Sequence, residues 1–110
     1  MFEHIKAVFD ESLHRDGRIV VVVFYASYCP FCLQFSSYMK KHSSNTLFLF
    51  AKADVTDDDS PLWGKYHLAT VPTLIAFKDG KEIARREAPL GVGLDEDDFV
   101  TFLSQLVTFT

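Results

Sequence analysis

The two cysteines of this 110-residue chain, Cys29 and Cys32, are the residues whose type and spacing most directly indicate chemistry. They follow an apolar, β-branched run at residues 20–25 that is typical of a buried strand, and they stand where that strand should end and a helix begin. A Cys-x-x-Cys motif in this position is typical of a dithiol that is repeatedly oxidised and reduced. The sequence therefore predicts thiol–disulfide exchange at this pair.

The predicted helix start assigns different roles to the two thiols. The first backbone N–H groups of a helix lack intrahelical partners and carry a partial positive charge, which stabilises a thiolate, the nucleophilic form of cysteine. Cys32 follows one turn later on the same side of the helix. Pro30 suits the first turn, because its missing N–H has no role there. We expect an exposed Cys29 to attack and Cys32 to resolve the resulting mixed disulfide.

Two other uses of the cysteine pair are disfavoured. A structural zinc site needs four ligands, whereas the histidines stand singly along the chain, at His4, His14, His42 and His67. A purely structural disulfide is also a poor explanation, since closing a two-residue loop removes little entropy from the unfolded chain. We therefore predict no metal and no cofactor beyond the redox-active disulfide that Cys29 and Cys32 can form.

Length and composition predict one domain, residues 1–110, with a single core rich in its eleven phenylalanines. A net charge of −4 without a basic patch argues against nucleic acid and anionic membranes as partners. The longest apolar run, residues 19–26, is too short to span a bilayer, and the N-terminus shows no basic segment followed by an apolar one. We therefore expect a cytoplasmic monomer.

Periodicity predicts alternating helices and strands along the chain. We expect helices at residues 2–15, 29–42, 61–66 and 95–107, and strands at 18–25, 47–53, 69–77 and 82–87, with a chain break at Ser43 and a hairpin turn at Asp79-Gly80. The first two strands and the helix between them predict a parallel crossover. The charged residues of the last strand, Glu82, Arg85, Arg86 and Glu87, predict a solvated sheet edge.

Taken together, these elements and motifs resemble the thioredoxin family over nearly the whole chain. The resemblance is carried by Phe24-Tyr25-Ala26-Ser27-Tyr28-Cys29-Pro30-Phe31-Cys32, Ala51-Lys52-Ala53-Asp54, Lys65-Tyr66, Val71-Pro72-Thr73 and Phe77-Lys78-Asp79-Gly80. It implies an α/β thioredoxin fold, with a mixed sheet flanked by helices on both faces. We expect four strands rather than five, because there is hardly room for the family's initial strand before the predicted first helix.

The resemblance also assigns site residues. It implies that Cys29 is the attacking nucleophile, that Cys32 is the resolving thiol and that Pro72 is a cis-proline lying against them. Val71 would offer its backbone to an extended substrate strand. The substrate surface implied in this way comprises Tyr28, Pro30, Phe31, Val71, Pro72 and either Gly91 or Gly93, with Tyr25 and Lys52 as auxiliary residues.

Three departures from the family pattern carry further expectations. Pro30-Phe31 stands between the cysteines instead of Gly-Pro and is similar to the Pro-aromatic pair of glutaredoxins, which predicts a more oxidising couple. The family's buried acid falls on Val23, so Lys52 would lack its carboxylate partner and either reach water or favour a Cys32 thiolate directly. The tryptophan that often precedes the first cysteine is replaced by Tyr28, and the chain's single tryptophan, Trp63, is distant in sequence.

The function implied is that of a protein-disulfide oxidoreductase, acting on disulfide-containing proteins and re-reduced by a thioredoxin-reductase-like donor. A glutathione-dependent, glutaredoxin-like enzyme is the second hypothesis, although no Gly-Gly followed by Asp is placed for glutathione. The third is a binding module that uses the fold without catalysis.

Overall fold

A computed structural model describes residues 1–42 and 44–110, so the chain break predicted at Ser43 lies outside the described residues. The strands are β1 (Ala7–Val8), β2 (Ile19–Tyr25), β3 (Phe48–Asp54), β4 (Thr73–Lys78) and β5 (Lys81–Glu87). The helices are α1 (Pro30–Lys40), α2 (Leu62–Lys65) and α3 (Glu96–Leu106), with short 3₁₀ helices η1 (Glu11–Arg15) and η2 (Val107–Phe109). No helix in this described part has the length and apolar character needed to cross a membrane.

The strands form one mixed sheet in the order β1-β3-β2-β4-β5. β2 lies in the middle, parallel to β3 and antiparallel to β4, and all its residues except Tyr25 are buried. α1 connects β2 to β3, which confirms the predicted parallel crossover. The sheet has a fifth strand, β1, which pairs with β3 through two residues. The initial strand for which the sequence left hardly any room is therefore present, but very short.

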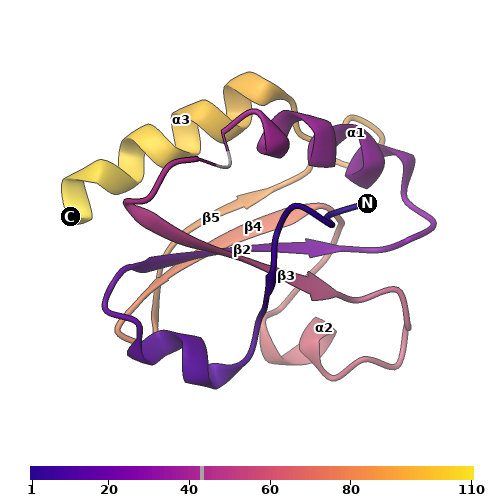
Figure 1. Cartoon of the computed structure of the whole chain (residues 1–110). Helices are drawn as coiled ribbons and strands as arrows, with labels where there is room; N and C mark the ends of the chain where they lie inside the picture. The colour runs from indigo at the N-terminus through magenta and orange to yellow at the C-terminus, as the bar shows by residue number, and fades with distance from the viewer. Residues whose placement is uncertain (43) are drawn as a thin grey trace.

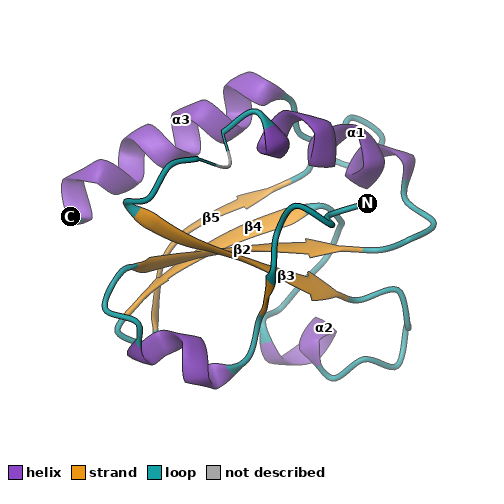
Figure 2. Cartoon of the chain, in the orientation of Figure 1, coloured by secondary structure: helices purple, strands orange, loops and turns teal. Residues whose placement is uncertain are grey.

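Both faces of the sheet are covered, as predicted. Figures 1 and 2 show α1 and α3 over one face and α2 with η1 over the other. Alternate residues of β2 supply the two cores: Val21 and Val23 face the side of α1 and α3, and Val20 and Val22 face the side of α2. A central strand buried on both faces explains the continuous apolar run in the sequence.

The predicted helix at residues 2–15 is wrong. Phe2 and Ile5 pack in the core on the α1 side of the sheet, whereas Phe9 packs in the core on the α2 side. One straight helix cannot deliver its apolar stripe to two opposite faces of a sheet. The segment instead passes along the sheet edge as β1 and then forms η1. Asp10 caps the start of η1, because its side chain accepts a hydrogen bond from the backbone N–H of Ser12.

The C-terminal hairpin and helix form close to where the sequence predicts them, except that β4 begins at Thr73 and not at residue 69, because the segment before it is the cis-proline loop. Asp79 and Gly80 both adopt positive φ, of 51° and 83°, which joins β4 to β5 in a tight turn. α3 begins after Asp95, and Asp95 and Asp98 form a reciprocal capping box. The ring of Phe99 on α3 meets Phe35 on α1 edge-on at 5.7 Å, which fixes α1 over the sheet.

The prediction that all charged residues of β5 are solvated is wrong for one of them. β5 is an edge strand, but the Arg85 side chain is only 21% exposed. Its guanidinium turns back onto the segment that follows α2 and donates to the backbone carbonyls of Tyr66 and His67. Edge position therefore does not make this side chain part of the solvated surface.

Candidate functional site

The cysteine pair lies at the junction of β2 and α1, as predicted. Cys29 is the N-cap of α1, and Pro30 occupies the first helical position. The backbone N–H of Cys32 donates to Cys29 Sγ at 3.1 Å. The same N–H lies 3.1 Å from the Cys29 carbonyl, so this helix-start donor is shared between the carbonyl and the sulfur of Cys29.

The two cysteines are reduced and differ in their environment. Cys29 retains 7% of its surface and Cys32 none, so Cys29 is more covered than the exposed residue that we expected. Burial, followed by the neighbouring Cys29, raises the pKa of the Cys32 thiol far above its ordinary value. Cys32 is therefore held as a thiol while Cys29 is the sulfur that can meet a substrate.

The loop before β4 brings a distant part of the chain to the cysteines. The peptide bond between Val71 and Pro72 is cis, which confirms the conformation implied for Pro72. The Cys29 thiol points to the carbonyl oxygen of Val71, with 3.7 Å between Sγ and O. Pro72 therefore lies beside the dithiol, and the Val71 backbone borders the reactive sulfur.

An apolar hollow of about 230 Å³ opens next to the dithiol. Its lining joins the start of α1 and the residue that precedes Cys29, the first turn of α2, the cis-proline loop and the loop after β5: Tyr28, Phe31, Trp63, Ala69, Thr70, Val71, Pro89, Leu90 and Gly91. Tyr28 is 61% exposed and Leu90 is 90% exposed. Large apolar side chains left in contact with water beside a reactive group are typical of a docking surface.

The two candidate glycines have different positions. Gly91 lines the hollow, whereas Gly93 is buried and lies directly against the ring of Phe31. Both have positive φ, of 76° and 79°. Of the two glycines that the sequence left as alternatives, Gly91 therefore lines the hollow and Gly93 lies behind it.

The prediction that Lys52 favours a Cys32 thiolate is wrong. Lys52 pairs with Val23 across β3 and β2, but its amine donates to the backbone carbonyl of Phe2, 3.2 Å away. The pKa of Cys32 is raised, because burial outweighs every group that acts on this thiol. Lys52 therefore anchors the N-terminal segment.

Tyr25, the other auxiliary residue, belongs to the wall of the core that surrounds Cys32. Its ring packs against Phe2, with 4.8 Å between ring centroids. Burial, and then the charge of Asp54, raises the pKa of its hydroxyl. Tyr25 is placed to support the site, and not to exchange protons near neutral pH.

Sequence reasoning missed five residues that line the hollow: Trp63, Ala69, Thr70, Pro89 and Leu90. The Trp63 indole N–H donates to the carbonyls of Val55 and Asp57, at 3.1 and 3.2 Å, which holds its ring at the hollow. Tyr28 and Trp63 therefore share the surface where the family often has a tryptophan before the first cysteine. No sequence signal identifies these residues, because α2 and two separate loops bring them together.

Metal ligands do not gather at the site. Within residues 1–42 and 44–110, no three His, Cys, Asp or Glu side chains come together in a group that could hold an ion.

Comparisons with known proteins agree with this geometry. The family model described as Thioredoxin matches residues 1–104. Thioredoxin-1 of Saccharomyces cerevisiae is 36% identical over 78 residues, which cover 70% of this chain and 74% of that protein. The thioredoxin of Chlamydia caviae is 30% identical over 89 residues, or 79% of this chain and 81% of that protein. The X-ray structure of Fasciola hepatica thioredoxin superposes with a TM-score of 0.72 and 27% identity, covering 86% of this chain and 88% of the other. The chain therefore belongs to the thioredoxin family and is a thiol-disulfide oxidoreductase.

Proposed function

We propose that the chain acts as a single domain that reduces disulfides of other proteins, with Cys29 as the nucleophile and Cys32 as the resolving thiol. The observation that carries this assignment is the difference between the two sulfurs. Cys29 Sγ accepts a hydrogen bond from the Cys32 N–H and borders the Val71 backbone, whereas the Cys32 side chain is fully buried. No bound cofactor is needed, because the two sulfurs themselves hold the two electrons that are transferred.

In the first step, the Cys29 thiolate attacks one sulfur of the substrate disulfide. A bond forms between Cys29 Sγ and that sulfur, the substrate S–S bond breaks, and the other substrate sulfur leaves as a thiolate that takes a proton. The helix-start N–H at 3.1 Å stabilises the charge on Cys29 before the attack.

In the second step, Cys32 loses its proton and attacks Cys29 Sγ. The mixed disulfide breaks, the second substrate thiol is released, and a Cys29–Cys32 disulfide remains. The substrate has gained two electrons and the dithiol has lost two. Because burial holds Cys32 protonated, the departing substrate thiolate is a suitable acceptor for its proton.

The substrate segment docks as a short extended strand along Val71. Its apolar side chains enter the hollow between Tyr28, Trp63 and Leu90. A surface of this kind favours clients whose disulfide lies in an exposed, extended segment with apolar neighbours.

A donor must return two electrons and two protons to the disulfide. We assign this role to a thioredoxin-reductase-like protein, and we place the chain in the cytoplasm as a monomer, where reducing conditions maintain the dithiol. Phe31 in place of a proline before Cys32 favours a couple more oxidising than the value of about −270 mV typical of thioredoxin. Equilibration with glutathione buffers of known potential measures this difference.

The test is reduction of insulin by dithiothreitol, with and without the protein. We expect the chain to accelerate the reaction, Cys29→Ser to abolish the acceleration, and Cys32→Ser to accumulate a mixed disulfide with insulin at Cys29. No acceleration by the intact dithiol would contradict the proposal. A high activity on a glutathione mixed disulfide, without turnover by a thioredoxin reductase, would favour the glutaredoxin-like alternative, and a biological role that survives Cys29→Ser/Cys32→Ser would favour a binding module.

A further inference from the structure

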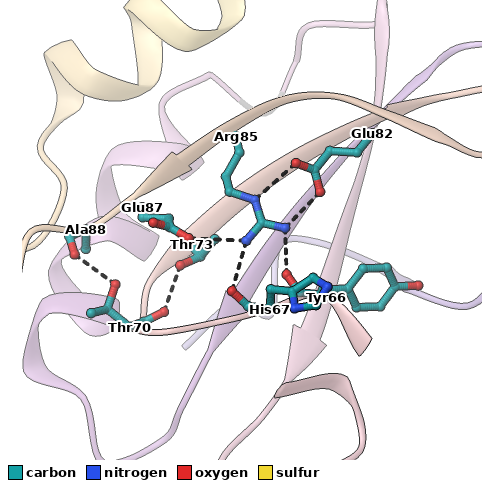
Figure 3. A network of polar contacts seen from close by, with 8 residues as sticks. All are labelled: Tyr66, His67, Thr70, Thr73, Glu82, Arg85, Glu87 and Ala88. Atoms are coloured by element: carbon teal, nitrogen blue, oxygen red, sulfur yellow. Dashed lines mark hydrogen bonds and ion pairs between the residues drawn. The ribbon is translucent and has the colours of Figure 1, made fainter. Parts of the chain in front are cut away.

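Arg85 connects two segments of the chain that lead into the lining of the hollow. Its Nη2 donates to the carbonyl of Tyr66 at 2.6 Å and its Nη1 to the carbonyl of His67 at 3.2 Å. Glu82 accepts from Nε and Nη2 at 3.1 and 2.8 Å, and Glu87 accepts from Nη1 at 3.2 Å. Figure 3 shows the guanidinium between the Glu82 carboxylate and the two carbonyls.

Each of the two segments leads directly into the site. Beyond Tyr66 and His67 the chain continues through Ala69, Thr70 and Val71, which form one part of the lining. Beyond Arg85, strand β5 ends and the chain continues through Pro89, Leu90 and Gly91, which form another part. Arg85 therefore joins two segments of the lining a few residues behind the surface that a substrate would touch.

A second set of contacts closes the same gap nearer the dithiol. Thr70 Oγ1 donates to the carbonyl of Ala88 at 2.8 Å, and the Ala88 N–H donates to the carbonyl of Pro72 at 3.2 Å. Thr73 Oγ1 donates in turn to the carbonyl of Thr70 at 2.7 Å, as Figure 3 also shows. These bonds tie the cis-proline loop to Ala88 after β5. The bonds of Arg85 tie the turn that precedes this loop to β5 itself.

The turn that Arg85 holds follows the four-residue helix α2 and is closed by hydrogen bonds from the His67 N–H to the Gly64 carbonyl at 3.3 Å and from the Leu68 N–H to the Trp63 carbonyl at 2.9 Å. The carbonyls of Tyr66 and His67 take no part in these bonds, and Arg85 donates to both. His67 has a φ of 52°, in the left-handed region that a residue with a Cβ rarely adopts. A planar cation with several donors in a fixed fork can bind both carbonyls at once, which a flexible point charge does less well.

We propose that Arg85 is a positioning residue that sets the width of the substrate hollow by holding the Tyr66–His67 turn against β5. The inference rests on the proposed function, because it concerns how a protein disulfide is held beside Cys29. The hydrogen bonds of Arg85 go to Tyr66, His67, Glu82 and Glu87 and to neither cysteine. Its removal therefore alters docking and leaves the thiol chemistry in place.

The test compares Arg85→Met with Arg86→Met. Methionine keeps a long unbranched stem and removes every donor. Arg86 is the matched control: it is the next residue on β5, its side chain is 51% exposed and its ion pair goes to Asp98. Each variant is assayed with insulin, a protein disulfide, and with cystamine, a small disulfide that does not need the hollow.

We expect Arg85→Met to raise the KM for insulin about tenfold, because several charge-assisted hydrogen bonds are lost. The kcat for insulin and the rate with cystamine should stay within about twofold, as expected when only substrate binding is affected. Arg86→Met should match the wild type in all three quantities. An unchanged KM for insulin in Arg85→Met, or an equal loss with cystamine, would overturn the proposal.

A measurement without substrate separates this proposal from the proposed function. Amide hydrogen exchange at Leu68 and Ala88, whose N–H groups donate to the carbonyls of Trp63 and Pro72, should become about tenfold faster in Arg85→Met and not in Arg86→Met. Unchanged exchange would overturn the positioning role even if the wild type reduces insulin. If Arg85→Met does not fold, Arg85→Lys keeps the charge without the fork, and we expect at least about a threefold rise in KM; a KM equal to that of the wild type would overturn the proposal.

Discussion

The ring of Phe31 lies against the bare Cα of Gly93. A Cβ at Gly93 would come within 2.7 Å of Phe31 Cδ1 and 2.9 Å of Phe31 Cβ, closer than carbon atoms approach. Phe31 belongs to the Cys-x-x-Cys motif, whereas Gly93 lies in the loop before α3. The large residue between the cysteines is therefore accommodated by a missing side chain more than sixty residues away in sequence.

Substitution of this glycine should destabilise the protein by more than backbone strain alone. We expect Gly93→Ala to lower the free energy of unfolding by about 1–3 kcal/mol more than Gly91→Ala, because of overpacking against Phe31. Gly91 is the matched control, since it has a similar positive φ of 76° and nothing within 4 Å of its Cβ position. Urea denaturation of both variants measures the difference. Equal losses would show that Phe31 moves aside without cost.

The buried Cys32 should make the stability of the reduced protein depend on pH in the alkaline range. Burial raises the pKa of Cys32 in the folded state, so the unfolded chain releases this proton first as the pH rises. The contribution is fully present below the unfolded value of about 8.5 and is lost above it, by up to about 1.4 kcal/mol per pH unit. Urea denaturation of the reduced protein between neutral and alkaline pH, compared with Cys32→Ser, isolates this slope. Parallel curves for the two proteins would contradict the role of burial.

Leu90 should contribute to docking without contributing to the fold. Its side chain is 90% exposed at the edge of the hollow, so Leu90→Ser should leave the melting temperature unchanged. We expect the KM for insulin to rise about tenfold or more, because burial of a leucine on docking is worth about 1.5 kcal/mol or more. Val107→Ser is the control, since Val107 is 50% exposed on η2. A KM that changes equally in both variants would remove Leu90 from the docking surface.

Lys52 should affect stability and not the reactivity of the dithiol. Lys52→Met removes the hydrogen bond to Phe2, and we expect a loss of about 1 kcal/mol in the free energy of unfolding. The rate of Cys29 alkylation at neutral pH and the reduction potential should stay at their wild-type values. Lys65→Met, which removes an exposed ion pair to Glu11 and a contact of the amine with the Tyr66 ring 5.6 Å away, should lose less than about 0.5 kcal/mol. A shifted potential in Lys52→Met would restore the alternative in which Lys52 favours a Cys32 thiolate.

The local elements followed from the sequence where each residue's neighbours in the chain settle its structure. The buried run before Cys29, the Asp79-Gly80 turn and the acidic cap of α3 all rest on contacts within a few residues, and all were predicted. The segment at residues 2–15 was predicted wrongly because its apolar spacing fits a helix, although its residues pack on two faces of a sheet that forms later in the chain.

The sequence by itself determined the reacting groups, because Cys29, Pro30 and Cys32 are adjacent and a helix start after a buried strand is a local property. Only the tertiary structure decided what surrounds them. Trp63 reaches the site from α2, Leu90 and Gly93 reach it from the loop between β5 and α3, and Arg85 turns from an expected solvated edge onto the segment after α2. These placements depend on long-range packing, in which a residue's role is set by partners tens of positions away and leaves no periodic pattern in the chain.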